Sequence, residues 1–375
     1  MKKLNLILAI VFLFTVVFIG CKKEDDLQPE KIVPQNFKVE IPSSLSSTSN
    51  TKSANGDTLS GGEIYGHLRF FIAVGEGAAD IVQGIMRAIG QHGLNQAMSF
   101  SFTSDDDGRV KNVNIVESAD FEGKTYEYLL TMTDALSENE ADGGMAMQVY
   151  WDRDPIIGSA ILKSYNINRN NPDKLDQAMI RIDYSETGTN GYEKQMVVYI
   201  SDLPVADPQI NKYSISSMKM FAGQNGDIVE VFGNSNHPNA TFHSGDYMGF
   251  NWAFVGAADT LNNISVAEVG LPASTLDSDS RQVILVDNSI KNVFTREISA
   301  WIFEEWGFVP TEEQLEPYLQ NTNAPGYFSN GGFVAAGTAP NSNYSAIEAA
   351  ILELVPYNPL SVTNLKVEFN LNTTK

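Results

Sequence analysis

Histidines are among the residues of this sequence that could bind a metal ion. His237 and His243 both lie in the segment HPNATFHSGD, and Asp246 follows three positions after the second histidine. The other two histidines are His67 and His92, and a zinc site needs three or four such ligands that converge. The alternative is an irregular polar loop without a metal, and the sequence favours that alternative. We therefore predict no metal site.

Ser216 and Lys219 have the Ser-x-x-Lys spacing found in acyl enzymes of the penicillin-binding type. That chemistry requires a helix on which both side chains share one face. The surrounding residues alternate between apolar and polar as in a strand, and no S-D-N or K-T-G segment accompanies them. The G-x-S-x-G and H-E-x-x-H motifs are also absent. We predict no catalytic residue and no cofactor, and a non-enzymatic role is favoured.

Acidic residues cluster in the segments SDDDG and LDSDS, where they could bind calcium. Neither segment matches the D-x-D-x-D-G loop with its distant glutamate. Asp105 to Asp107 precede Gly108 between two alternating runs, so a hairpin turn explains them better. The carboxylates are also too numerous to identify a glycosidase pair, which requires two facing acids at a set separation.

Aromatic side chains that could stack on sugars occur in the segment WIFEEWGF. Trp301 shares a helical stripe with two isoleucines, which favours a position in the core, and Trp306 follows five positions later. Better candidates for exposed aromatic side chains lie in the glycine-rich segment APGYFSNGGF: Tyr327, Phe328 and Phe333.

Cys21 is the only cysteine, and it follows Gly20 at the end of an apolar run. The run covers Leu6 to Ile19, and two lysines precede it, Lys2 and Lys3. A charged start, a short apolar stretch and a small residue at the end are typical of a secretory signal. A membrane-spanning helix needs about 20 apolar residues, so this run is too short to span.

The segment FIGC resembles the lipobox of bacterial lipoproteins, with Phe18 in place of the usual aliphatic residue. The resemblance implies cleavage after Gly20 and acylation of Cys21, which would attach the protein to a membrane. The segment CKKEDD resembles the export signal of Bacteroidota-type lipoproteins. This second resemblance implies an outer-membrane lipoprotein exposed on the cell surface; the alternative is a position facing the periplasm.

The composition limits the partners of the protein. The formal net charge is −21 at pH 7, and cleavage after Gly20 would remove two further lysines. Such a surface repels nucleic acid and anionic headgroups, so neither is an expected partner. Hydrophobic residues make up 43% of the chain, which excludes general disorder. With Cys21 acylated, no disulfide can form, and a core must hold the fold together.

The chain divides by composition into four parts. We predict a signal peptide over residues 1–20, a lipidated flexible tether over 21–62, a helix with an antiparallel sheet over 63–287, and C-terminal helices with a last strand over 288–375. The tether is mostly small and polar. Its exception is FKVEI, where Phe37, Val39 and Ile41 alternate and could form a strand or a docking point.

Alternating runs between Met98 and Asp287 predict about ten to twelve strands joined in sequence. Asp107-Gly108, Asn190-Gly191 and Asn225-Gly226 mark hairpins, because a type I′ turn needs positive φ at both central residues. The segment QVILVD is predicted as a strand of this sheet. The expected fold is α+β: a large antiparallel meander, curved or closed into a half-barrel, with one N-terminal helix and a C-terminal helical cluster.

Helical spacing of apolar residues predicts the first helix over Glu76 to His92, after an extended segment EIYGHLRFFIAVG. A second helix runs from Ile290 to Trp306. TEEQ and SAIE resemble capping boxes that open short helices. The segment LKVEFNL alternates as a final strand.

The order of elements, a helix followed by a long meander, resembles the half-barrel of LolA- and LppX-type lipid carriers. That resemblance implies an apolar or lipid-like ligand held in a curved sheet. Four methionines at alternating strand positions fit such an adaptable apolar surface: Met145, Met147, Met218 and Met220. Two alternatives remain: a surface protein that binds or processes glycans, and an envelope interaction component without a small ligand.

Overall fold

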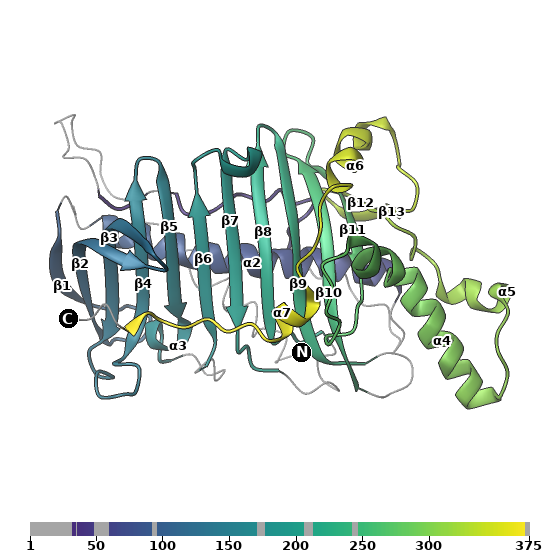
Figure 1. The fold of residues 1–375 in the computed structure, drawn as a ribbon, viewed down its shortest axis with the longest axis horizontal. Helices are drawn as coiled ribbons and strands as arrows, with labels where there is room; N and C mark the ends of the chain where they lie inside the picture. Colours follow the sequence, from purple (N-terminus) through teal and green to yellow (C-terminus); the bar gives the residue numbers. More distant parts are fainter. Residues whose placement is uncertain are drawn as a thin grey trace. The chain divides into compact units, whose positions relative to one another are not determined.

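The structure is a computed structural model, and it describes residues 32–34, 36–48, 60–91, 96–170, 177–205, 213–241 and 247–371. Thirteen antiparallel strands form one sheet, in which the strand order follows the chain order (Figure 1). This confirms the antiparallel meander and the α+β class. Eleven strands lie between Met98 and Gly270, within the expected number, and two more follow. The signal segment and Cys21 lie outside the described residues.

The strands have the following bounds: β1 Met98–Thr103, β2 Val110–Phe121, β3 Lys124–Asp134, β4 Met145–Arg153, β5 Ile156–Lys163, β6 Met179–Ser185, β7 Lys194–Ser201, β8 Ser217–Asn225, β9 Ile228–Thr241, β10 Tyr247–Asp259, β11 Ile264–Gly270, β12 Gly326–Ser329 and β13 Gly332–Ala336. The helices are α2 Gly61–Gly90, α3 Ser164–Ile167, α4 Ile290–Trp306, α5 Glu312–Leu315, α6 Ser345–Ile351 and α7 Pro359–Thr363, with short turns η1 Thr189–Gly191, η2 Gln282–Asp287, η3 Glu316–Tyr318 and η4 Ser342–Tyr344.

The described residues belong to two compact units. The first contains residues up to Lys38, 77–190 and 367 onward, and the second contains 39–76 and 191–366. Strands β1–β6 therefore belong to the first unit, whereas β7–β13 and α4–α7 belong to the second. In the part of the chain that the structure describes, no helix is both long and apolar enough to cross a membrane.

The predicted hairpins are present. At Asn190-Gly191 both central residues have positive φ, 59° and 84°, as predicted, but the other two turns differ in detail. Gly108 and Gly226 have φ of 67° and 55°, whereas the residues before them, Asp107 and Asn225, do not have positive φ. The predicted type I′ geometry is therefore wrong at these two turns. The β1–β2 loop is closed by the Ser104 N–H, which donates to the Arg109 carbonyl at 2.9 Å. The loop between these two residues is therefore longer than a two-residue turn.

Helix α2 begins much earlier than predicted. The segment predicted as extended, residues 63–75, is helical, and the helix runs unbroken from Gly61 to Gly90. Its buried apolar side chains follow helical spacing on both sides of Gly75: Ile64, Leu68, Phe71, Ile72, Ala78, Val82, Ile85, Met86 and Ile89. The β-branched and aromatic residues at 70–74 suggested a strand, and this tertiary packing outweighs their propensity.

The segment FKVEI is a docking point and not a strand. Phe37, Val39 and Ile41 are buried without forming strand pairs. In the first unit, the Phe37 N–H donates to Gln83 Oε1 at 3.0 Å. In the second unit, the Ile41 N–H donates to Glu76 Oε1 at 3.1 Å. Residues 36–41, which we assigned to the tether, are therefore packed against α2 by side-chain hydrogen bonds.

Three further segments differ from the prediction. QVILVD is not a strand but the π-helical turn η2, whose Ile284 and Leu285 are both buried. LKVEFNL is not a strand; in the first unit Asn370 pairs through its backbone with the Gln148 side chain, at 2.9 Å in both directions. The segment SAIE opens α6, but its N-cap is Tyr344 without a capping side chain. By contrast, the Thr311–Gln314 capping box of α5 is confirmed.

Candidate functional site

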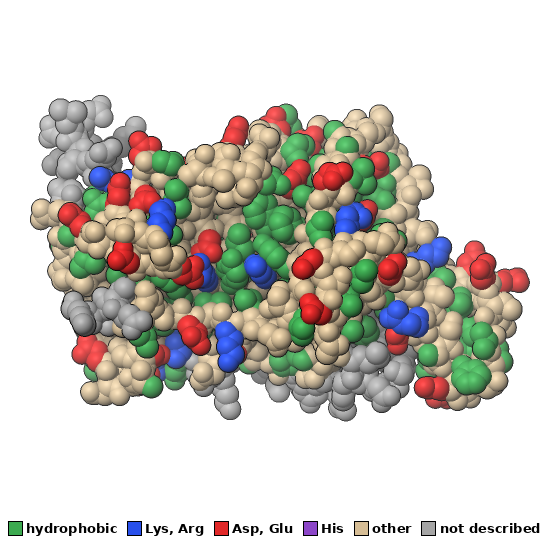
Figure 2. Space-filling model, in the orientation of Figure 1, with side chains coloured by type: hydrophobic (Ala, Val, Ile, Leu, Met, Phe, Trp, Pro, Cys, Tyr) green, Lys and Arg blue, Asp and Glu red, His purple; other side chains and the backbone are tan. Residues whose placement is uncertain are grey.

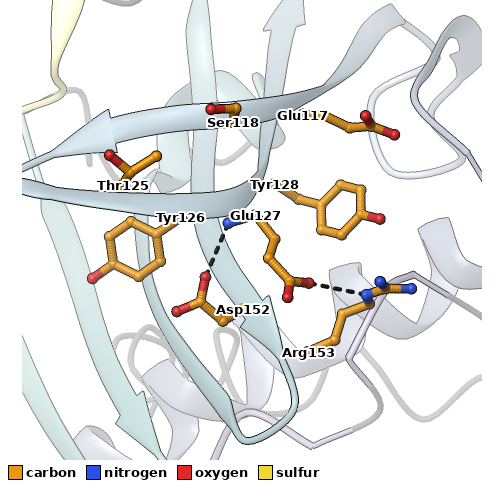
Figure 3. Close-up of a pocket in the computed structure, with 8 residues that line it drawn as sticks. All are labelled: Glu117, Ser118, Thr125, Tyr126, Glu127, Tyr128, Asp152 and Arg153. Carbon is orange, nitrogen blue, oxygen red and sulfur yellow. Dashed lines mark hydrogen bonds and ion pairs between the residues drawn. The ribbon is translucent and has the colours of Figure 1, made fainter.

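A surface depression of about 440 Å³ lies at one end of β2, β3 and β4 in the first unit (Figure 3). Its lining consists of polar and aromatic residues: Glu117, Ser118, Thr125, Tyr126, Glu127, Tyr128, Asp152 and Arg153. None of these described lining residues is aliphatic. The depression therefore has the chemistry of a site for a polar ligand.

Two features of the β2–β3 hairpin shape this depression. Its turn is Glu122-Gly123, with φ of 48° and 81°, the positive pair that a type I′ hairpin requires. Before the turn, Ser118 also has a positive φ of 57°, and the otherwise continuous register omits a pair between Glu117 and Ala119. The ladder is therefore interrupted four residues from the turn.

This interruption separates Tyr126 from Tyr128. Residues two apart in a regular strand point to the same face. Here Tyr126 lies 5.9 Å from the ring of Tyr150, whereas Tyr128 stacks on Trp151 at 5.3 Å. Because Tyr150 and Trp151 are consecutive in β4 and face opposite sides, the two tyrosines lie on opposite sides of that strand. Figure 3 shows their rings pointing away from each other, with Glu127 and Asp152 between them.

Both carboxylates between the tyrosines are held in place. Arg153 Nε donates to Glu127 Oε2 at 3.0 Å, with the two side chains 39% and 45% exposed. Asp152 accepts from the Glu127 backbone N–H at 2.9 Å and pairs with Lys124 Nζ at 2.8 Å. The cations also cover the rings, with the Arg153 guanidinium 5.3 Å from the centre of Tyr128. Two oriented acceptor groups thus face solvent beside aromatic rings.

This arrangement presents hydrogen-bonding groups to a ligand. Burial, together with the nearby charges of Asp183 and Asp152, raises the pKa of Tyr126, so its hydroxyl stays a donor at neutral pH. Arg153 and Lys124 hold the carboxylates of Glu127 and Asp152 in place, so the depression offers positioned hydrogen-bond acceptors.

A second depression of about 290 Å³ lies on β1–β3 of the same unit. Two cross-strand rows of small polar side chains line it, Ser99–Asn114–Thr131 and Ser101–Asn112–Thr133. Ser99 and Ser101 donate to Asn114 and Asn112 at 2.6 and 2.7 Å. These rows extend the polar, hydroxyl- and amide-bearing surface over three neighbouring strands.

Comparison of the chain with protein-family models, with curated proteins and with solved structures finds no match in any of the three.

The candidate histidine site considered from the sequence is not assembled in the described residues. His237 is completely buried in the second unit, where it contacts Phe71 and Trp252 and lies 2.9 Å from Ser235 Oγ through Nε2. Complete burial, with a smaller contribution from His67, lowers its pKa to about 3. His92, His243 and Asp246 lie outside the described residues. Among those described, no group of three or more His, Cys, Asp or Glu could hold a metal ion.

Ser216 and Lys219 do not form a pair. Ser216 Oγ donates to Asn236 Oδ1 at 2.7 Å. Lys219 lies in strand β8, with its ammonium group 4.0 Å from the ring centre of Tyr357. Both side chains have structural partners in the second unit, as expected for a segment that forms a strand and not a helix.

The acidic segment SDDDG contributes to a buried ion cluster, defined here as Asp107, Arg109, Lys111 and Asp134. Lys111 Nζ lies 2.9 Å from Asp107 and 2.7 Å from Asp134, and Arg109 lies 2.6 Å from Asp134. Lys111 also donates to the Asn166 carbonyl at 3.0 Å. Side-chain cations thus occupy the positions that a calcium ion would need. In the segment LDSDS, Asp277 accepts from Asn358 at 2.6 Å.

The aromatic predictions were partly wrong. Tyr327 and Phe328 are buried in β12, where Tyr327 packs edge-on against Tyr344, and only Phe333 is partly accessible. Trp301 is half-buried and not part of the core, and its ring lies 5.0 Å from that of Trp306, which is 56% exposed. The exposed aromatic residues therefore lie at the end of α4 and not in the glycine-rich segment.

The methionines predicted to line a ligand cavity are core residues. Their exposed fractions are 3% or less: Met145, Met147, Met218 and Met220. In the second unit, α2 approaches the sheet so closely at Gly75 that an added Cβ would lie 2.6 Å from Met220 Cε. The space that an apolar ligand would need between Gly75 and Met220 is filled.

The sequence analysis missed the β2–β4 depression altogether. Only a weak signal was available: YEY, residues 126–128, places two tyrosines around a glutamate in a predicted strand. Regular alternation would put both rings on one face. The positive φ of Ser118, which changes that arrangement, has no signature in the residue type.

Proposed function

We propose that the protein is a lipid-anchored envelope lipoprotein that binds a hydroxyl-rich ligand, a glycan, at the β2–β4 depression. The observation that carries the proposal is the lining itself: two tyrosines, two ion-paired carboxylates and no aliphatic side chain. Membrane attachment rests on the lipobox-like segment before Cys21, and the cell-surface location rests on CKKEDD.

Charge and polarity favour a neutral sugar over other ligands. Three carboxylates and one guanidinium line the depression, so an anionic ligand would be repelled. An apolar ligand would displace water from the ion-paired carboxylates of Glu127 and Asp152 without supplying hydrogen bonds in its place. A polyhydroxylated ligand supplies donors to these carboxylates and accepts from Tyr126 and Arg153. The polar rows on β1–β3 would add contacts for a longer chain.

The lipid-carrier hypothesis has less support. It requires an incompletely filled apolar face, whereas the four alternating methionines are buried and α2 lies against Met220 at Gly75. Ordinary core packing accounts for these residues. We therefore prefer the glycan-binding alternative and propose no catalytic role.

Screening distinguishes these alternatives. The purified chain would be applied to an array of neutral, acidic and amino sugars, and in parallel to extracted envelope lipids. We expect retention on neutral oligosaccharides. Retention on lipids with no sugar bound would overturn the proposal in favour of the carrier, and binding to neither would favour an interaction component.

A further inference from the structure

Helix α4 ends in a group of exposed apolar side chains, here called the α4 tip: Phe303, Trp306, Phe308 and Val309. Their exposed fractions are 55%, 56%, 43% and 74%. Single exposed apolar residues are common on protein surfaces, but a cluster of large ones marks an interaction site. Four within seven positions of the second unit therefore require an explanation.

The geometry of α4 shows why these side chains are presented to solvent. Five buried residues form the packed stripe of the helix: Ile290, Val293, Phe294, Ile298 and Ile302. The stripe stops at Ile302, and the last turn lacks cover among the described residues. Gly307, at φ 72°, ends the helix by donating its N–H to the Phe303 carbonyl at 2.9 Å. This turn brings Phe308 and Val309 next to the helix end.

One aromatic ring of the tip, that of Trp306, packs against a ring outside the tip. Trp301 packs edge-on against Trp306, with ring centres 5.0 Å apart, and against Tyr318 at 6.5 Å. Pairs of this kind contribute about 0.5–1.5 kcal/mol beyond their burial. Trp306 is therefore held in place before a partner binds, which lowers the entropic cost of binding at this side chain.

Charge distinguishes the occupants that the tip could accept. Five exposed glutamates lie close to the apolar residues in the sequence: Glu304, Glu305, Glu312, Glu313 and Glu316. The sequence has no lysine or arginine between Arg296 and Lys366. Figure 2 shows hydrophobic side chains (green) beside acidic ones (red) over α4 and α5. An anionic membrane surface and a second copy of this acidic chain would both be repelled.

We propose that the α4 tip docks a protein segment that presents apolar side chains flanked by lysine or arginine. Apolar contact with Trp306 and Phe308 would supply affinity, and the glutamates would steer and orient the basic partner. This surface belongs to the second unit and is independent of the β2–β4 depression in the first.

The test uses two synthetic helical peptides with the same leucine pattern, one carrying lysines and the other glutamates. The full chain should bind the lysine peptide, with a shift of tryptophan emission to shorter wavelength and an affinity that falls as salt rises from about 50 to 300 mM. The double variant Trp306→Ser/Phe308→Ser should weaken binding about tenfold or more.

Leu136→Ser and Leu261→Ser are the matched controls, because these leucines are 73% and 75% exposed but lie outside the tip. Their affinities should stay within about twofold of the unmodified chain. Circular dichroism of each variant checks that α4 is still folded. Equal binding by the tip variant, or equal binding of the glutamate peptide, would overturn the proposal. Tip-dependent binding to phosphatidylcholine vesicles, or tip-dependent dimerisation, without peptide binding would overturn it too.

Discussion

Lys111 Nζ lies 2.7 Å from Asp134 Oδ2, and their side chains are only 1% and 0% exposed. The same ammonium group contacts Asp107 at 2.9 Å, so one buried cation serves two carboxylates. These contacts join the β1–β2 turn to the end of β3. Removing one member of such a buried pair leaves an uncompensated charge in the interior.

Lys111→Met should therefore destabilise the first unit by about 3–5 kcal/mol. The matched control is Glu122→Gln, which breaks the bidentate but exposed pair with Arg181 and should cost less than about 1 kcal/mol. Hydrogen exchange of β2 and β3 amides under native conditions measures both. The assignment of a structural role to this cluster fails if the two variants cost the same.

The buried ion cluster should also make the first unit sensitive to acid. Burial alone would raise the pKa of Asp134, but hydrogen bonds from Arg109 and Lys111 and their positive charges outweigh it and hold that pKa far below its usual range. A folded-state pKa below the unfolded value gives stability that is complete above about pH 5 and is lost as pH falls below it. Unfolding measured between pH 6 and pH 2 should show this loss, and Asp134→Asn should reduce the slope. Identical slopes would show that Asp134 does not carry the effect.

The buried ring of His237 should make the second unit lose stability on acidification too. This loss should begin at a higher pH than the loss caused by Asp134. The folded pKa of His237, about 3, lies below the ordinary value of 6.5. The unfolded state therefore binds an extra proton between these values, and stability falls by about 1.4 kcal/mol per pH unit as pH decreases from about 6 to about 4. Proton NMR should show the ring neutral at pH 5. A His237 resonance that titrates near pH 6.5 would mean that the ring is accessible.

Substitution of Phe37 tests whether residues 36–41, which were assigned to the tether, belong to the fold. The Phe37 side chain is fully buried and stacks on Tyr184 at 5.5 Å. Phe37→Ala should cost about 3–5 kcal/mol, whereas Asn36→Ala, at an exposed position, should be neutral. Chemical denaturation gives both values. If Phe37→Ala were also neutral, residues 36–41 would be part of a tether after all.

Elements with strong local signals could be predicted from the sequence. Alternation gave the meander, helical spacing gave α4, and Thr311 with Gln314 gave the capping box of α5. The start of α2 also had a signal that we missed. Ser60 and Glu63 form a reciprocal pair, with the Glu63 N–H donating to Ser60 Oγ at 3.2 Å and the Ser60 N–H donating to Glu63 Oε2 at 2.8 Å.

Features that depend on long-range packing could not be predicted. Asn370 pairs with Gln148, which lies 222 positions away, in place of a strand partner. η2 forms beside Gly270, where an added Cβ would lie 2.2 Å from the Ile284 carbonyl oxygen. The candidate site depends on Ser118, whose positive φ is uncommon for a serine. The residue types next to these positions in the sequence do not predict these features.

Binding of a glycan by Glu127 and Asp152 can be measured by calorimetric titration with a neutral oligosaccharide. The oligosaccharide would be the strongest array ligand, titrated into the unmodified chain, Glu127→Gln and the control Glu122→Gln. Both glutamates are exposed and paired with an arginine, but only Glu127 lines the depression. We predict that Glu127→Gln weakens binding about tenfold or more, since a hydrogen bond to a charged group contributes about 1.5–3 kcal/mol, and that Glu122→Gln leaves it unchanged. Equal affinities for all three proteins would contradict the assignment of the β2–β4 depression as the binding site.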